Sequence, residues 1–158
     1  MAERTGIIGF TGAFKENVAE VRDGGKLVFA GSVAVCTPFA ELLAYAVRDR
    51  GFELIYMPRA IPAEARRMVW KEGIGFGVSE ERADPRGADV LVLLGGLAMP
   101  RYGCSVQEVE VAIRELTVTT RPKLIGVCFM SIFERTGWSA RLPFDVIIDT
   151  KLEVDIKH

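Results

Sequence analysis

The sequence predicts an α/β protein, a three-layer Rossmann-like sandwich around a mainly parallel sheet of five to six strands. Short apolar runs alternate along the chain with stretches of helical period, which is the order of a parallel sheet with crossover helices. The run 90–94 (VLVLL) is apolar throughout, as a parallel strand is when both its faces are covered. At 158 residues, the chain is expected to form one domain over 1–158.

In the N-terminal half, Phe14, Val18 and Val21 recur at helical spacing, whereas residues 1–12 have no clear period and are expected to be loosely held. Thr37 is a plausible N-cap, followed by Pro38 at the first helical position. The expected elements are a helix over 11–22, a strand over 26–30, a helix over 37–51, a strand over 52–57, a short helix over 62–73 and a weak or edge strand over 74–78.

In the C-terminal half, Gly95 and Gly96 end the central apolar run, and Ser105 with Glu108 has the spacing of a capping box. The expected elements are a strand over 90–94, a helix over 105–116, a strand over 123–128, a second capping box at Ser131 and Glu134, and a strand over 144–148. Residues 151–158 alternate apolar and polar side chains, which predicts an edge-strand tail.

These elements fit the strand order 3-2-1-4-5-6, with the short third strand at one edge, and a flavodoxin-like order is the alternative. In the favoured order the topology reverses between the first and fourth strands, where open α/β sheets bind ligands. Residues 31–37 and 95–105 would flank the crevice there.

The carboxyl edge of this sheet is expected to favour an anion, because three helices would begin there with unpaired N–H groups. Arg59 and Arg101 lie on the same rim and could bind a phosphate or carboxylate. The expected ligand-binding residues are Gly31, Ser32, Thr37, Arg59, Gly95, Gly96, Arg101, Ser105 and Ser131. Caps that serve only their own helices, and arginines that are simply solvated, are the alternative.

No cofactor is indicated. The turn after the first strand is not G-x-G-x-x-G, and no G-x-x-x-x-G-K-[ST] occurs. An NAD site would place an acid near the end of the second strand, but the only acid of that strand, Glu53, lies at its start.

Three cysteines, Cys36, Cys104 and Cys128, fall at the carboxyl ends of neighbouring predicted strands. A thiol near a helix N-terminus can act as a nucleophile or a soft metal ligand, so these are candidate catalytic or metal-binding residues. The alternative is inert packing, because free cysteine is often buried. The single histidine, His158, is the last residue, so no Cys–His or Ser–His–Asp arrangement has an internal base.

A formal net charge of −1 argues against a nucleic-acid partner. Residues 27–47 carry one charge, Glu41, but Gly31 and Pro38 interrupt them, so no membrane span is expected. An odd number of cysteines without a C-x-x-C pair, together with a start that does not read as a signal peptide, predicts a cytoplasmic protein.

The run GGLAMPRYGCS (95–105), followed by IGVCFM (125–130), resembles a small family of uncharacterised Rossmann-like proteins from methanogenic archaea. The resemblance lies in the second half of the chain. It implies a cytoplasmic protein of an anaerobe and transfers no catalytic residue.

Three functions remain open from the sequence. The favoured one is a protein that binds a small anionic or phosphorylated metabolite in the crevice. The second is a thiol- or metal-dependent enzyme that uses Cys36, Cys104 and Cys128. The third is a non-catalytic oligomeric scaffold or subunit. The edge-strand tail predicts a homodimer that forms through it, with a monomer whose edge is protected by charged side chains as the alternative.

Overall fold

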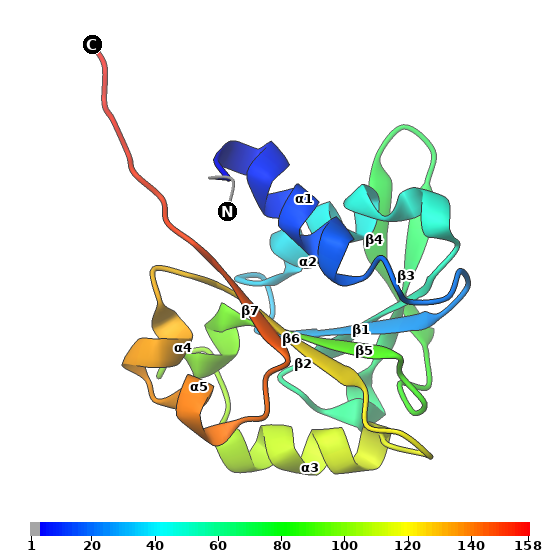
Figure 1. The fold of residues 1–158 in the computed structure, drawn as a ribbon. Coiled ribbons are helices and arrows are strands. Elements are labelled where there is room, and N and C mark those ends of the chain that lie inside the picture. The colour runs from blue at the N-terminus through cyan, green and yellow to red at the C-terminus, as the bar shows by residue number, and fades with distance from the viewer. Residues whose placement is uncertain (1–3) are drawn as a thin grey trace.

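A computed structural model describes residues 4–158, in which a seven-stranded sheet lies between two layers of helices (Figure 1). One face is covered by α1 (Gly6–Asn17) and α2 (Thr37–Ala46), and the other by α3 (Val106–Leu116), α4 (Ile132–Arg135) and α5 (Trp138–Arg141). Three short 3-10 turns occur, η1 (Arg48–Arg50), η2 (Pro62–Glu64) and η3 (Gly95–Ala98). The three-layer α/β sandwich is confirmed.

The sheet has the order β4-β3-β2-β1-β5-β6-β7. Its strands are β1 (Lys26–Gly31), β2 (Glu53–Pro58), β3 (Arg66–Lys71), β4 (Gly75–Arg82), β5 (Val90–Leu94), β6 (Lys123–Phe129) and β7 (Val146–Thr150). Five of them, β2-β1-β5-β6-β7, run parallel, while β3 and β4 form an antiparallel hairpin at one edge.

The predicted strand order is wrong in its count and at this edge. Numbered among themselves, the five parallel strands read 2-1-3-4-5, which is the flavodoxin-like alternative. The strand predicted near residues 74–78 is β4, which reaches the edge through an antiparallel partner instead of lying parallel to β2. The neighbours β1 and β5 are nevertheless the pair between which a crevice was expected.

The short helix predicted over 62–73 is also wrong, because only the turn η2 is helical there and half of the segment forms β3. Ala65, Met68 and Val69 had suggested a helical face, but cross-strand packing outweighs that weak period. Trp70 lies opposite Phe76 of β4, with the ring centroids 5.3 Å apart, and stacks on Tyr45 of α2. Aromatic pairs of this kind stabilise a hairpin relative to alanine.

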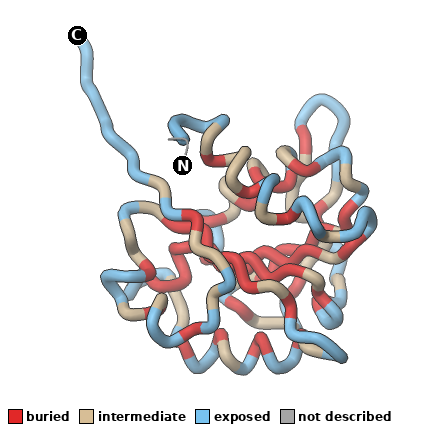
Figure 2. The backbone as a smooth tube through the Cα atoms, viewed as in Figure 1, coloured by how far each residue is buried: buried red, intermediate tan, exposed pale blue. Residues whose placement is uncertain are grey.

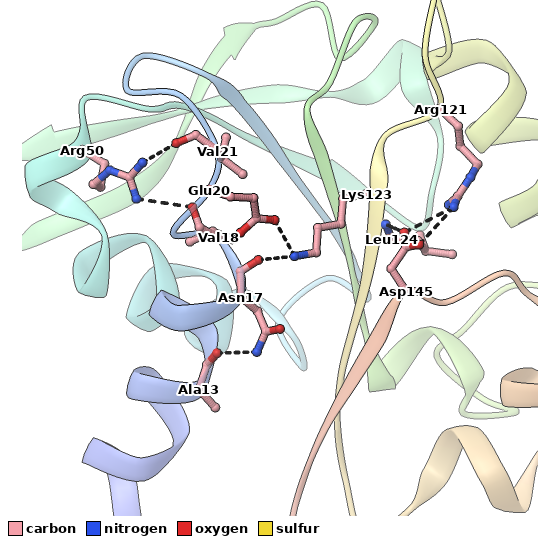
Figure 3. Close-up of polar contacts among 10 residues, drawn as sticks. All are labelled: Ala13, Asn17, Val18, Glu20, Val21, Arg50, Arg121, Lys123, Leu124 and Asp145. Carbon is pink, nitrogen blue, oxygen red and sulfur yellow. Dashed lines mark hydrogen bonds and ion pairs between the residues drawn. The ribbon is translucent and has the colours of Figure 1, made fainter.

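The N-terminal helix begins at Gly6 and ends at Asn17, so each of its ends lies five residues before the end predicted for the helix over 11–22. Residues 6–12 are helical instead of loosely held. Residues 1–3 of that prediction lie outside the described residues. Phe14 is fully buried against the sheet. Lys123 Nζ at the start of β6 donates to the Asn17 carbonyl and to Glu20, each at 2.6 Å, which fastens the end of α1 to the sheet (Figure 3).

Residues 151–158 do not form the predicted edge strand within this chain. They run on from β7 as an extended, exposed tail (Figure 1). The register explains the difference, because Thr150 pairs with Phe129, the last residue of β6. Beyond that point, no strand within residues 4–158 lies beside the tail to exchange backbone hydrogen bonds with it.

Burial is concentrated in the central strands (Figure 2). Successive side chains of β1 and β5 belong to the cores beneath opposite helix layers. Val28 and Leu91 belong to the core beneath α3, and Phe29 and Val92 to the core beneath α1 and α2. Among residues 4–158, every helix is too short or too polar to cross a bilayer.

Candidate functional site

A pocket of about 240 Å³ opens at the carboxyl ends of β5 and β6, beside the N-terminus of α2. Its walls are almost entirely apolar, and a single charged side chain reaches it. The lining residues are Val35, Cys36, Phe39, Leu94, Gly95, Gly96, Met99, Val127, Phe129, Met130, Ile132 and Arg135. The pocket is thus lined from both predicted flanks of the crevice, residues 31–37 and 95–105, and it extends further to the loop after β6.

Backbone strain is concentrated at this edge of the sheet. Among residues 4–158, the residues other than glycine with positive φ are Ala34, Arg59, Ala60, Met130 and Ser131. All five follow the carboxyl ends of β1, β2 or β6. Side chains disfavour this left-handed conformation, and such residues gather at functional sites more often than elsewhere. The strain marks the same edge as the pocket.

Met130 and Ser131 are held in this conformation by β7. The Asp149 carboxylate accepts hydrogen bonds from the Ser131 backbone N–H at 2.9 Å and from Ser131 Oγ at 2.8 Å. Met130 N donates to the Thr150 carbonyl at 2.9 Å. These bonds fix the loop that forms one wall of the pocket.

The charged residue in the wall is Arg135, on the short helix α4. Its Nε donates to the Met130 carbonyl at 2.9 Å, which sets the direction of the guanidinium group. Within residues 4–158, Arg135 forms no ion pair. A positive charge without a protein counter-charge thus lies at the border of an apolar pocket.

The predicted glycines are required by close packing. A Cβ at Gly95 would lie 2.8 Å from Cys128 Cβ, one at Gly31 would lie 2.5 Å from Cys36 Cβ, and one at Gly96 would overlap Cys36 Sγ. Gly95 and Gly96 also line the pocket, whereas Gly31 does not. Close packing therefore accounts for all three glycines.

Ser32 joins two loops and does not line the pocket. Its Oγ donates to the Tyr102 carbonyl at 2.6 Å, and its carbonyl accepts from Tyr56 Oη at 2.9 Å. Burial raises the pKa of Tyr56 to about 12, so this phenol remains a donor at neutral pH. Thr37 is the first residue of α2, and Cys36 occupies the N-cap position predicted for Thr37.

The two predicted capping boxes have different outcomes. At α3 the box is confirmed, because Ser105 Oγ accepts from Glu108 N and the Glu108 carboxylate accepts from Ser105 N. At α4 the prediction is wrong, since Ser131 has φ 60° and its hydroxyl bonds Asp149. The Glu108 carboxylate thus lies at the N-terminus of α3 and the Asp149 carboxylate at the N-terminus of α4, and both oppose binding of an anion there.

The two predicted arginines lie outside the pocket. Arg59 is exposed, and its Nη2 donates to the Gly103 carbonyl at 3.5 Å beside a separate shallow hollow near Pro62. Arg101 is exposed in the turn after η3. The fold therefore does not place Arg59 or Arg101 beside Arg135 in the wall of the pocket.

The sheet separates Cys36 from Cys104 and Cys128. Cys36 packs in the core beneath α1 and α2, while Cys128 belongs to the opposite core and Cys104 packs against it. Within residues 4–158, no group of three potential metal ligands (His, Cys, Asp or Glu) converges. Burial raises the pKa of Cys36, and it raises that of Cys104 and of Cys128 to about 11. All three are therefore thiols at neutral pH.

Sequence reasoning missed the pocket-lining residues that follow β6, above all Arg135. One signal could have located it. The loop after β6 lies beside the loop after β5 in the predicted strand order, and Arg135 follows that loop by one helical turn. The aromatic wall formed by Phe39 and Phe129, whose ring centroids are 4.7 Å apart, gave no signal beyond apolar periodicity.

Comparison with known proteins gives a consistent result. Residues 5–153 match the model of the family described as "Uncharacterized protein conserved in archaea (DUF2124)". The chain is 41% identical to an uncharacterised protein of Methanocaldococcus jannaschii over 138 residues, which cover 86% of this chain and 81% of that protein. It is 37% identical to an uncharacterised protein of Methanothermobacter thermautotrophicus over 153 residues, which cover 97% and 94%.

A solved structure has the same fold. It is a crystal structure of a protein of unknown function from Methanothermobacter thermautotrophicus, with a TM-score of 0.88 and 35% identity. The match covers 100% of this chain and 96% of that one. The resemblance seen in the second half of the sequence therefore extends over nearly the whole chain.

Proposed function

This chain belongs to the archaeal family DUF2124, and we propose that it binds a small metabolite with an apolar body and one anionic group. The apolar body occupies the pocket between α2, η3 and α4, and the carboxylate or phosphate group pairs with Arg135. The observation that carries the proposal is this apolar pocket with one arginine at its border that forms no ion pair with any of residues 4–158.

The size of the pocket limits the ligand. Ligand sites in proteins commonly enclose about 300–1,000 Å³, so a pocket of about 240 Å³ is slightly smaller than that range and suits only a small ligand. A dinucleotide does not fit it. The walls offer Phe39, Phe129 and Ile132 to an apolar group, and Met99 and Met130 can adapt to its shape.

The charge at the border selects the polar end of the ligand. A guanidinium group binds carboxylate and phosphate oxygens through paired N–H donors. In Arg135 the Nε is engaged with Met130, which leaves the two terminal nitrogens for the ligand. The raised thiol pKa values give no support to a cysteine nucleophile, so the proposal is binding and includes no catalytic step.

The test uses straight-chain carboxylates of increasing length, the matching alkyl phosphates and inorganic phosphate as probes, with binding measured by calorimetry and melting temperature. The proposal expects binding that strengthens with chain length until the pocket is full and then weakens. At a concentration about a hundredfold above the Kd, the ligand should stabilise the protein by about 2.7 kcal/mol.

Variants locate the site. Arg135→Gln should weaken binding about tenfold or more, because it removes the charge that pairs with the anion. Arg141→Gln, on neighbouring α5, and Arg101→Ala should leave binding unchanged, because neither side chain lines the pocket. The proposal fails if no probe of any length binds, or if Arg135→Gln and Arg141→Gln bind the probes equally well.

A further inference from the structure

We infer that the tail, residues 151–158, is the dimerisation element of this protein, and that it pairs antiparallel with the β7 edge and tail of a second copy. The inference is independent of the ligand proposed above. It commits to a second copy of this chain as the partner. Four observations carry it.

The first is the apolar face of the tail, which no part of residues 4–158 covers. Leu152, Val154 and Ile156 are 58%, 87% and 76% exposed. They share one face of an extended chain, and the same alternation places them in line with Ile148 of β7, which is buried beneath α1. The tail runs away from the body of the molecule (Figure 1), so the apolar face that begins at Ile148 in the core continues into solvent.

The second is the free edge of β7. Thr150 accepts a hydrogen bond from Met130 on the β6 side, so its neighbours Asp149 and Lys151 direct their backbone groups away from β6. Among the described residues, no strand pairs with this side of β7. An unpaired edge of this kind is a template for a strand from another chain.

The third is the hollow beside that edge. A groove of about 520 Å³ lies between the first turns of α1 and the end of β7, and small residues such as Gly6, Gly9 and Ala13 form its helical wall. Phe10 also lines this groove. A strand added to β7 would turn its apolar face toward this wall of α1.

The fourth is charge complementarity, which selects a symmetric register. With Glu153 opposite the partner subunit's Glu153, Lys151 faces the partner subunit's Asp155 and Asp149 faces the partner subunit's Lys157. This register makes four opposite-charge pairs and one like-charge pair across the twofold axis. Registers shifted by two residues would instead place Asp149 opposite Asp155, or Lys151 opposite Lys157.

A second copy is the partner that these observations favour. Both surfaces required, the tail and the β7 edge with its groove, are present on each chain, so one twofold operation satisfies both at once. Charged and apolar side chains alternate along the tail. In the proposed register, each charged side chain therefore lies opposite a charged one and each apolar side chain lies on the same face as the partner's apolar side chains.

The decisive measurement is the molar mass of the full chain by light scattering over a wide range of concentrations. The expected mass is about twice the 17.4 kDa of one chain. Val154→Asp should reduce the mass about twofold, because it places a charge on the apolar face, without changing the far-UV spectrum. Val118→Asp, the same change at a valine that is 67% exposed in the connection between α3 and β6, is the matched control and should remain dimeric.

A cysteine pair tests the register. Directly opposite residues in an antiparallel pair lie within disulfide range, whereas residues four positions away do not. Glu153→Cys should therefore form an intermolecular disulfide under mild oxidation, and Lys151→Cys should not. A full chain that is monomeric at the highest concentration, or a Val154→Asp variant that stays dimeric, overturns the inference. Disulfide formation by Lys151→Cys in place of Glu153→Cys overturns the register.

Discussion

Asp149 of β7 holds Ser131 by two hydrogen bonds, at 2.9 Å to its backbone N–H and at 2.8 Å to its hydroxyl. Ser131 and the preceding Met130 both have positive φ, a conformation that costs a residue with a side chain roughly 1–2 kcal/mol. The carboxylate thus maintains the strained turn that forms one wall of the pocket. It also links that wall to the strand from which the tail emerges.

Asp149→Asn should destabilise the folded protein by about 1–2 kcal/mol, because each carboxylate oxygen accepts one of these bonds and an amide keeps only one acceptor oxygen, which is neutral. The exposure of Asp149 keeps the loss within this range. Urea unfolding followed by circular dichroism measures this change. Asp49→Asn in η1 is the control, since the Asp49 carboxylate makes no ion pair within residues 4–158. Equal stability of the two variants would show that the turn does not depend on Asp149.

Gly96→Ala should destabilise the protein by about 1–3 kcal/mol, because the added methyl group would overlap Cys36 Sγ. Cys36→Ala should restore most of this loss in the double variant, since it removes the overlapping sulfur. Thermal or urea unfolding of the two single variants and the double variant gives their coupling energy. Purely additive losses would contradict the close packing of these two residues.

Stability at acidic pH should depend in part on Asp145. Burial alone would raise its pKa, but hydrogen bonds from Leu124 N and Arg121 lower the pKa overall (Figure 3). A carboxyl whose pKa is lowered by folding stabilises the protein above its unfolded pKa of about 3.9, and this contribution is lost as the pH falls through the folded value.

Asp145→Asn should therefore be less stable than the original protein at neutral pH, and the difference should shrink below about pH 4. The side chain is 38% exposed, so solvent screening limits the difference to about 1 kcal/mol or less. Urea midpoints measured at neutral and acidic pH test this. A difference that grows as the pH falls would reverse the assigned sign.

The cysteines should react slowly with alkylating reagents at neutral pH. Burial raises the pKa of Cys104 and Cys128 to about 11, and an unperturbed thiol has a pKa near 8.5, so the reactive thiolate is depleted roughly three-hundredfold. Labelling resolved by mass spectrometry, with and without denaturant, measures the ratio. Rapid labelling of Cys104 in the folded protein would restore the possibility of thiol chemistry.

The sequence predicted the parallel core well, because its signals are local. The strands around Val28, Leu91 and Ile125 are continuous apolar runs, and the Ser105–Glu108 cap is a pattern of four residues. The hairpin at the edge was missed because the pairing of Trp70 with Phe76 is a tertiary contact. Periodicity within 62–73 contains no information about it.

The site was only partly predictable for a similar reason. Gly95 and Gly96 were placed at the correct edge because glycine ends a strand visibly in the sequence. Arg135 was missed because its role depends on the left-handed turn at Met130 and Ser131, which in turn depends on Asp149, eighteen residues further along the chain. The sequence showed the arginines at 59 and 101 equally clearly, but the fold directs both away from the pocket.

The hairpin formed by β3 and β4 joins the parallel sheet through only two residue pairs, Ile55 with Arg67 and Tyr56 with Arg66, whereas β1 and β2 pair along six. A unit attached so narrowly can separate while the other strands remain in place. Its backbone amides should therefore exchange with deuterium well before those of β1, β5 and β6. The sheet then contains two units that unfold separately. Amide exchange is slow in the parallel strands, which include the floor of the pocket, and fast in the β3–β4 hairpin beyond β2.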